Sequence, residues 1–189
     1  MTYATIQPPF TLKFREMPKE ALKRYFQWFL KVIPERIGEL SGEVQRSPRF
    51  DSWRSDYAPD SLGVLGYWFA DQVETRPRTE QEIREIKNRG PYVVEVGANE
   101  LTNRTFSLAI DVGMYFGEVL LRNYPSLRWR QYLDDKAYAD YGQPVIVEFL
   151  CGPLNPVRIS ISFAYGVARK QRTGERLREI HDYWIKQLQ

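Results

Sequence analysis

Apolar residues recur at spacings of three and four along most of the chain, which is the period of an amphipathic helix. The longest stripe starts after Met17-Pro18 and continues to about Arg46, with Pro34 inside it as a predicted break or kink. Its members are Leu22, Tyr25, Phe26, Phe29, Leu30, Ile33, Ile37, Leu40 and Val44. The first strong element of the chain is therefore a helical unit over about residues 18–46.

The segment ahead of this unit has a different character. Pro8 and Pro9 block helix formation there. Residues 1–17 are predicted to form an extended N-terminal arm, and residues 18–189 a single globular domain.

Further helices follow from apolar spacing and capping signals. A stripe over 62–73 begins after Asp60 or Ser61, either of which can cap it. Thr79 and Glu82 have the spacing of a capping box, and predict a short polar helix that ends at about Gly90. Two more helices are predicted near the C-terminus, one from Asn155-Pro156 to about Lys170 and one capped by Thr173.

One segment alternates between apolar and polar residues, as strands do, and a second, mostly apolar segment is also predicted to be a strand. They are LRWRQYL (127–133) and PVIVEFL (144–150), and an antiparallel pairing is predicted. YVVEV (92–96) is a third candidate strand, with a buried connector as the alternative. About six helices with two or three short strands predict an α+β fold in which helices dominate.

Residues 101–124 predict the central helix of the fold. The segment DVGMYFGEVLLRN is apolar around most of its circumference, as interior helices are. Gly113 and Gly117 each cost about 0.8–1 kcal/mol relative to alanine in a helix, so a neighbouring element is expected to approach closely there. Phosphate-binding glycines precede a helix, and these two lie within one.

A narrow polar stripe follows the same helix. Asp111, Tyr115, Glu118 and Arg122 are the candidate binding residues, and Arg104 extends the stripe toward the N-terminus. Glu118 and Arg122 have the favourable order for an ion pair at a spacing of four. Two interpretations stay open: a solvated edge of the protein, or the wall of a groove.

Bulk composition limits the function classes. The 189 residues carry 27 basic and 24 acidic side chains, a net charge of +3. This excess is small for a dedicated nucleic-acid binder. The chain has a single cysteine and neither a signal peptide nor a membrane span, which favours a cytoplasmic protein without a membrane partner.

Specific chemistry has little support in the sequence. Cys151 and His181 are the only candidates for a nucleophile and base pair, and a buried thiol and a packing histidine are the expected roles. One histidine and one cysteine do not make a zinc site, and DDKAYAD is no calcium loop. No nucleotide-binding motif is present. We therefore assign no catalytic, metal or cofactor residues.

A basic cluster lies between the last two predicted helices. Its members are Arg169, Lys170, Arg172, Arg176 and Arg178. Together with Arg128, Arg130 and Tyr132 around Trp129, this cluster keeps weak nucleic-acid binding as an alternative. Strand alternation places Trp129 on the face opposite its two arginine neighbours, which predicts a core position for the ring.

Several short motifs resemble those of small bacterial domains of unknown function, some associated with toxin-immunity neighbourhoods. The similar stretches are SLGVLGYWF (61–69), DVGMYFGE (111–118) and LRW (127–129), within about residues 58–168. In that family a helix with a Tyr-x-Gly-Glu element precedes a strand with a tryptophan. Tyr115, Gly117, Glu118 and Trp129 occupy these positions here. The resemblance implies a fold class and an immunity-like setting, and no catalytic residue.

The leading hypothesis is a non-enzymatic protein-interaction module with a protein partner. The first alternative is a hydrolase-like enzyme that uses Asp111 or Glu118 as a general base in a cleft. Self-association into a homo-oligomer is a further alternative.

Overall fold

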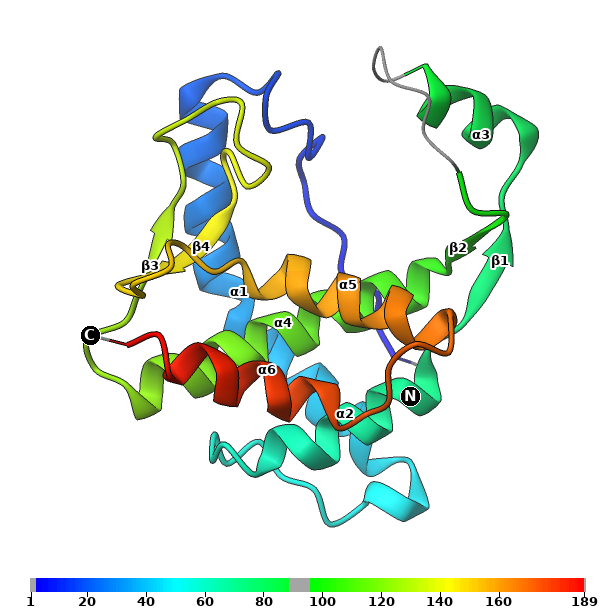
Figure 1. The fold of residues 1–189 in the computed structure, drawn as a ribbon, viewed down its shortest axis with the longest axis vertical. Helices are drawn as coiled ribbons and strands as arrows, with labels where there is room; N and C mark the ends of the chain where they lie inside the picture. Colours follow the sequence, from blue (N-terminus) through cyan, green and yellow to red (C-terminus); the bar gives the residue numbers. More distant parts are fainter. Residues whose placement is uncertain (1–2, 89–95, 189) are drawn as a thin grey trace.

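The computed structural model describes residues 3–88 and 96–188. Within them the chain forms six α-helices and four short strands (Figure 1). The helices are α1 (Lys19–Gln45), α2 (Ser61–Gln72), α3 (Glu80–Lys87), α4 (Asn103–Asn123), α5 (Pro156–Ala168) and α6 (Arg176–Ile185), with a 3-10 turn at Pro48–Phe50. The strands are β1 (Thr75–Pro77), β2 (Asn99–Leu101), β3 (Arg128–Gln131) and β4 (Pro144–Val147). The predicted helix-dominated α+β class is confirmed.

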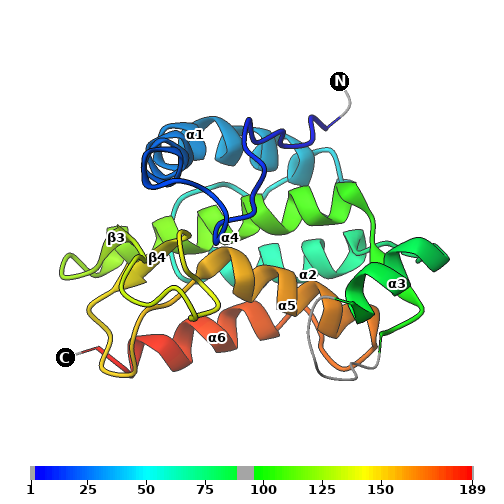
Figure 2. The same cartoon turned by 90° about the horizontal axis from the view of Figure 1, so that it is seen from above.

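Helix α4 is the centre of the fold. Helix α1 lies on one side of it and α5 and α6 lie on the other (Figure 2). The apolar side chains of α4 from Leu108 to Leu120, except the partly buried Ile110, have no solvent exposure, and they form one core with apolar residues of α1, α2, α5 and α6. The prediction of a buried central helix is therefore confirmed. Its start is later than expected, at Asn103, because residues 99–101 form β2.

Both glycines of α4 face a neighbour at close range. A β-carbon on Gly113 would lie 2.7 Å from the Cα of Val157 and 2.9 Å from the carbonyl oxygen of Pro156. A β-carbon on Gly117 would overlap the indole of Trp129. The predicted close approach is thus made by the first turn of α5 and by β3.

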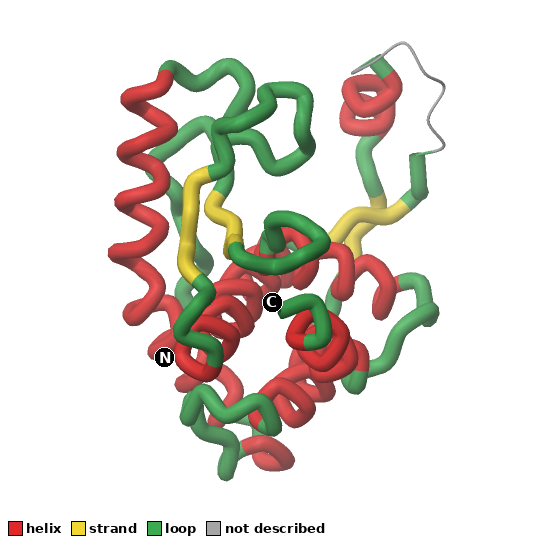
Figure 3. Tube along the Cα trace, turned by 60° about the vertical axis from the view of Figure 1, so that its left-hand side comes forward, coloured by secondary structure: helices red, strands yellow, loops and turns green. Residues whose placement is uncertain are grey.

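The four strands form two separate antiparallel pairs. Strand β3 pairs antiparallel with β4, as predicted, and the structure places Trp129 opposite Ile146. Strand β1 pairs with β2, with Arg76 opposite Glu100. Helix α3 lies between these two strands in the sequence and outside the helical layers in space (Figure 3). Three-residue strands are too short for an alternating pattern, so the sequence did not indicate this sheet. The candidate strand at 92–96 lies almost wholly outside the described residues.

The capping predictions divide into two groups. The capping box of α3 is present, since the Thr79 hydroxyl accepts from the Glu82 amide and the Glu82 carboxylate accepts from the Thr79 amide. Asn155 caps α5 by accepting from the amide of Arg158 at 3.0 Å. Asp60 does not cap α2, because its backbone is already helical and its carboxylate pairs with Arg178.

Three further sequence expectations differ from the structure. Thr173 precedes α6 by three residues and contributes its carbonyl, which accepts from Arg176. Helix α1 continues through Pro34, which lies on the exposed face of the helix. The predicted break is therefore absent. Cys151 is exposed, since it follows β4 in a surface loop. In the described part of the chain, no helix has both the length and the apolar composition of a membrane span.

Candidate functional site

Asp111, the first residue of the predicted polar stripe, faces α1 in the protein interior. Its carboxylate is fully buried and accepts two hydrogen bonds from Arg36, from Nε at 2.9 Å and from Nη2 at 2.7 Å. Burial raises the pKa of Asp111, and the hydrogen bonds and charge of Arg36 oppose that shift. This two-point ion pair joins α1 to α4 and takes the place of the solvated edge that the sequence suggested.

The N-terminal arm completes the same cluster. The hydroxyl of Tyr3 donates to Asp111, and Arg36 donates to that hydroxyl at 3.0 Å and to the carbonyl of Ala4 at 2.9 Å. The amide of Ile6 donates to the Ser107 hydroxyl at 2.7 Å. Burial is also the main cause of a raised pKa at Tyr3. The arm is therefore attached to both helices by side chains that solvent does not reach.

Tyr115 is the second buried member of the stripe. Its hydroxyl lies 2.7 Å from the Ser61 hydroxyl and accepts from the amide of Tyr57 at 3.1 Å. Because Ser61 donates to the carbonyl of Ala58 at 2.6 Å, Tyr115 is the donor to Ser61. Burial raises the pKa of the Tyr115 hydroxyl. This side chain anchors the loop before α2 to the central helix.

Glu118 and Arg122 reach the surface. Glu118 accepts from the indole nitrogen of Trp129 at 3.1 Å and lies 3.7 Å from the guanidinium of Arg122. Arg122 also covers the ring of Tyr57, with 3.5 Å between the guanidinium carbon and the ring centroid. The polar stripe is therefore split: Asp111 and Tyr115 stabilise the interior, and only the Glu118–Arg122 edge is accessible to a partner. Its binding role stays a prediction.

Cys151 and His181 have separate environments. Cys151 is exposed, whereas His181 has 1% exposure and lies against the rings of Phe116 and Tyr124. The Nδ1 atom of His181 is 2.9 Å from the Asp182 carboxylate, and Nε2 has no hydrogen-bond partner in the described ranges. Burial lowers the pKa of His181. Its surroundings are those of a packed core side chain.

Metal-ligand types do not gather in the described part of the chain. No group of three or more histidine, cysteine, aspartate or glutamate side chains is close enough there to hold an ion. Asp140, which the sequence placed in an acidic loop, is fully buried, and its carboxylate accepts from the side-chain Nδ2 of Asn155 at 2.9 Å. It links the β3–β4 loop to the start of α5.

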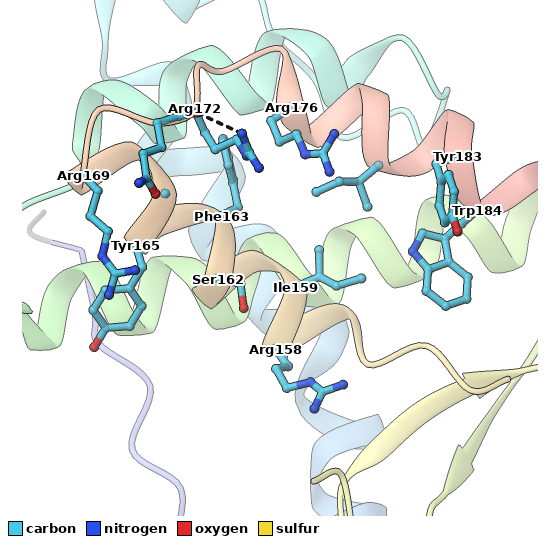
Figure 4. Close-up of a pocket in the computed structure, with 13 residues that line it drawn as sticks. Arg158, Ile159, Ser162, Phe163, Tyr165, Arg169, Arg172, Arg176, Tyr183 and Trp184 are labelled. Carbon is cyan, nitrogen blue, oxygen red and sulfur yellow. Dashed lines mark hydrogen bonds between the residues drawn. The ribbon is translucent and has the colours of Figure 1, made fainter. Parts of the chain in front are cut away.

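The most distinctive concave surface is a groove of about 830 Å³ between α5 and α6 (Figure 4). Its floor is apolar and its rim is basic and aromatic. The floor residues are Ile159, Phe163, Gly166 and Ile180, and the rim residues are Arg158, Ser162, Tyr165, Arg169, Gln171, Arg172, Arg176, Tyr183 and Trp184. We call this surface the α5–α6 groove. Its volume falls within the range of about 300–1,000 Å³ that is usual for binding pockets.

The four groove arginines differ in their partners. Arg158 lies 3.0 Å from Asp140, and Arg176 lies 3.0 Å from Glu179. Arg169 is placed over the ring of Tyr165, 5.8 Å from its centroid, and Arg172 donates to the carbonyl of Gln171 at 3.1 Å. Among the residues described here, neither Arg169 nor Arg172 has a carboxylate within salt-bridge distance. Within residues 3–88 and 96–188, these two guanidiniums are therefore not neutralised by a carboxylate.

A second hollow, of about 910 Å³, lies between the N-terminal arm, α3 and the β3–β4 loop. Its lining carries both signs of charge, with Lys13 and Glu16 paired at 3.6 Å. Arg15 donates to the carbonyl of Ala137 at 2.9 Å. Its charges are largely neutralised within the lining, so it offers less to a charged ligand than the α5–α6 groove does.

The sequence predicted only some of the basic residues that line this groove. Of the predicted basic cluster, Arg169, Arg172 and Arg176 line it, while Arg178 is held at the other side of α6 by Asp60 and Asp182. Lys170 is outside it. Arg158 was missed. The signal was present in the spacing of 158, 162, 165 and 169, which share one helical face.

Comparisons of the chain with protein-family models, with curated proteins and with solved structures give no match.

Proposed function

We propose that this chain is a non-enzymatic protein-interaction module whose binding face is the α5–α6 groove. The proposal depends on one observation: Arg169 and Arg172 are exposed and have no carboxylate partner among the described residues, in a groove that also has apolar residues and, at its other end, the exposed ring of Tyr183 (Figure 4). Arginine, tyrosine and tryptophan are the residues most often found as energetic anchors of protein interfaces. The groove combines all three.

The proposed biological setting is based on the sequence resemblance alone. The resemblance to bacterial domains of toxin-immunity neighbourhoods supports an immunity-like or regulatory role, with a protein as the partner. A free exposed thiol at Cys151 is compatible with the reducing conditions of the cytoplasm, where we place the module.

The hydrolase-like alternative has weaker support. A general base needs access to a substrate proton. Asp111 is fully buried and bound by Arg36 and Tyr3, and Glu118 accepts from Trp129 and faces Arg122. A nucleic-acid partner is the second candidate, because the same arginines and the rings of Tyr165 and Tyr183 could contact phosphates and bases.

Site-specific photo-crosslinking tests the proposed binding face. A photoreactive phenylalanine analogue is placed at Tyr183 in the groove and, as a control, at the exposed Tyr138 outside it. Both proteins are produced in cells that contain the native partner. We expect a discrete crosslinked protein from position 183 alone, and its loss on Arg172→Glu.

Two results decide against the proposal. Arg122→Glu serves as the charge-matched control on the Glu118–Arg122 edge, and it should leave the crosslink intact. If Arg122→Glu abolished the crosslink while Arg172→Glu did not, the edge predicted from the sequence would be the binding face. A crosslinked species that nuclease digests would identify nucleic acid as the partner.

A further inference from the structure

Three guanidiniums are concentrated at one end of the α5–α6 groove. Arg169 ends α5, Arg172 lies in the connecting turn, and Arg176 is the first residue of α6 (Figure 4). Arg158, at the other end of the groove, is eleven residues from Arg169, or about 16 Å along a helix. The turn end therefore carries most of the positive charge of the groove. Of its three arginines, only Arg176 pairs with a carboxylate among the described residues, that of Glu179.

The stem of Arg172 packs directly on the backbone of Gly166, where a larger residue would leave no room for it. A β-carbon on Gly166 would lie 2.7 Å from Cγ and 3.4 Å from Cβ of Arg172, so the stem of the arginine rests on bare helix backbone. Its one hydrogen bond within the described chain goes to the adjacent Gln171 carbonyl at 3.1 Å. A guanidinium has five N–H donors, so most of those of Arg172 have no partner among the described residues and can bind a ligand.

We infer that the turn end of the groove is an oxyanion subsite that receives carboxylates from an acidic segment of the partner protein, with Arg172 as the residue that sets specificity. This inference rests on the proposed function. A fork-shaped guanidinium binds a carboxylate through two parallel hydrogen bonds, which a lysine cannot reproduce. The segment also carries an apolar side chain, which covers Ile159, Phe163 and Ile180.

The floor favours a protein segment over nucleic acid. Binding to a phosphate backbone depends on many basic contacts along the strand. Here three of the four groove arginines lie at one end, and the adjoining surface is formed by Ile159, Ile180 and the buried Phe163. An acidic residue next to a large apolar one satisfies both parts of the groove.

A short synthetic peptide tests this inference. The probe has a central Leu-Phe pair between two pairs of glutamates, and binding is followed through the backbone amide NMR signals of the full chain. We expect shifts confined to α5, α6 and their turn. Arg172→Gln should weaken binding about tenfold, because a charge-assisted pair is lost. Arg172→Lys should weaken it nearly as much.

Gly166→Ala is the most specific variant, since it displaces the stem of Arg172 and leaves the net charge unchanged. It should weaken binding severalfold. Arg128→Gln is the matched control, because Arg128 is exposed and paired with Glu148 outside the groove. Its affinity for the peptide should equal that of the wild type. A dispersed amide spectrum confirms the fold of each variant, and Arg172→Lys decides the matter if Gly166→Ala does not fold.

Several outcomes would overturn the inference. Equal losses from Arg172→Gln and Arg128→Gln would mean general charge attraction. No groove shifts at millimolar peptide would remove the subsite, and equal binding of a peptide with glutamines for glutamates would remove the carboxylate. Tighter binding of a single-stranded oligonucleotide of equal charge would favour nucleic acid. A partner crosslink at Tyr183 together with any of these results would leave the proposed function standing without the acidic ligand.

Discussion

Arg36 of α1 and Asp111 of α4 form a buried two-hydrogen-bond ion pair, although 75 residues separate them in the sequence. A buried pair adds little to stability compared with well-packed apolar residues, but removal of one partner leaves an uncompensated buried charge. Tyr3 is bound to both members, so the pair also fixes the position of the arm.

This pair gives the first prediction. Arg36→Met should lower the free energy of unfolding by about 3–5 kcal/mol, because Asp111 is left buried and unpaired. The double variant Arg36→Met/Asp111→Leu should recover most of that loss. Urea denaturation measures both, with Arg49→Met, on the exposed surface, as a control of near-zero effect. Additive losses in the double variant would show that the two side chains do not act as a pair.

Close packing around α4 gives the second prediction. Gly113→Ala should destabilise the protein by about 1–3 kcal/mol, because the added methyl group meets the backbone of α5. Gly38→Ala is the matched control in α1, where a β-carbon has no neighbour within 4 Å. It should stabilise the protein by up to about 1 kcal/mol through helix propensity. Thermal unfolding of the two variants should therefore shift in opposite directions, and shifts of the same sign would contradict the packing.

Tyr115 should be a stability residue. Tyr115→Phe removes a hydroxyl that accepts from the Tyr57 amide and donates to Ser61, so the loss should be about 1–3 kcal/mol by denaturation. Tyr67→Phe, on the exposed face of α2, should change stability by less than about 0.5 kcal/mol. The crosslink at Tyr183 should persist in both variants. A folded, fully stable Tyr115→Phe protein that no longer bound its partner would restore the binding role that the sequence suggested.

His181 predicts a pH dependence. Burial lowers its pKa below the usual value of about 6.5, Arg178 lowers it further, and Asp182 acts in the opposite direction. The unfolded chain therefore takes up the proton first. The contribution to stability is present above about pH 6.5 and is lost as the pH falls through the folded-state pKa.

The chain has a single histidine, so one imidazole NMR signal reports this titration directly. Its midpoint should lie below about 6.5, and the free energy of unfolding should fall between pH 7 and pH 5. His181→Gln should flatten that fall. A midpoint above the usual value would mean that the charge of Asp182 outweighs burial.

The sequence predicted the elements in which a periodic pattern extends over many residues. It did not predict contacts between residues that are distant along the chain. The stripes of α1 and α4, the alternation of the β3 segment and the apolar run of β4 are local signals, and they indicated the class and the buried central helix. Periodicity placed Asp111 on a polar stripe, because nothing local reveals that Arg36 and Tyr3 meet it. The groove forms because α5 packs antiparallel on α6. This packing places Arg158 and the basic turn on the same concave surface. Cys151 was expected to be buried because cysteines usually are, and a surface loop exposes it.

Hydrogen–deuterium exchange of the protein alone and with its crosslink-identified partner decides whether the α5–α6 groove is the binding face, because it reports on every face at once. We expect slower amide exchange in α5, α6 and residues 169–175 on binding, with unchanged exchange around Glu118 and Arg122. Protection at the Glu118–Arg122 edge or along α1, with none in the α5–α6 groove, would contradict this expectation.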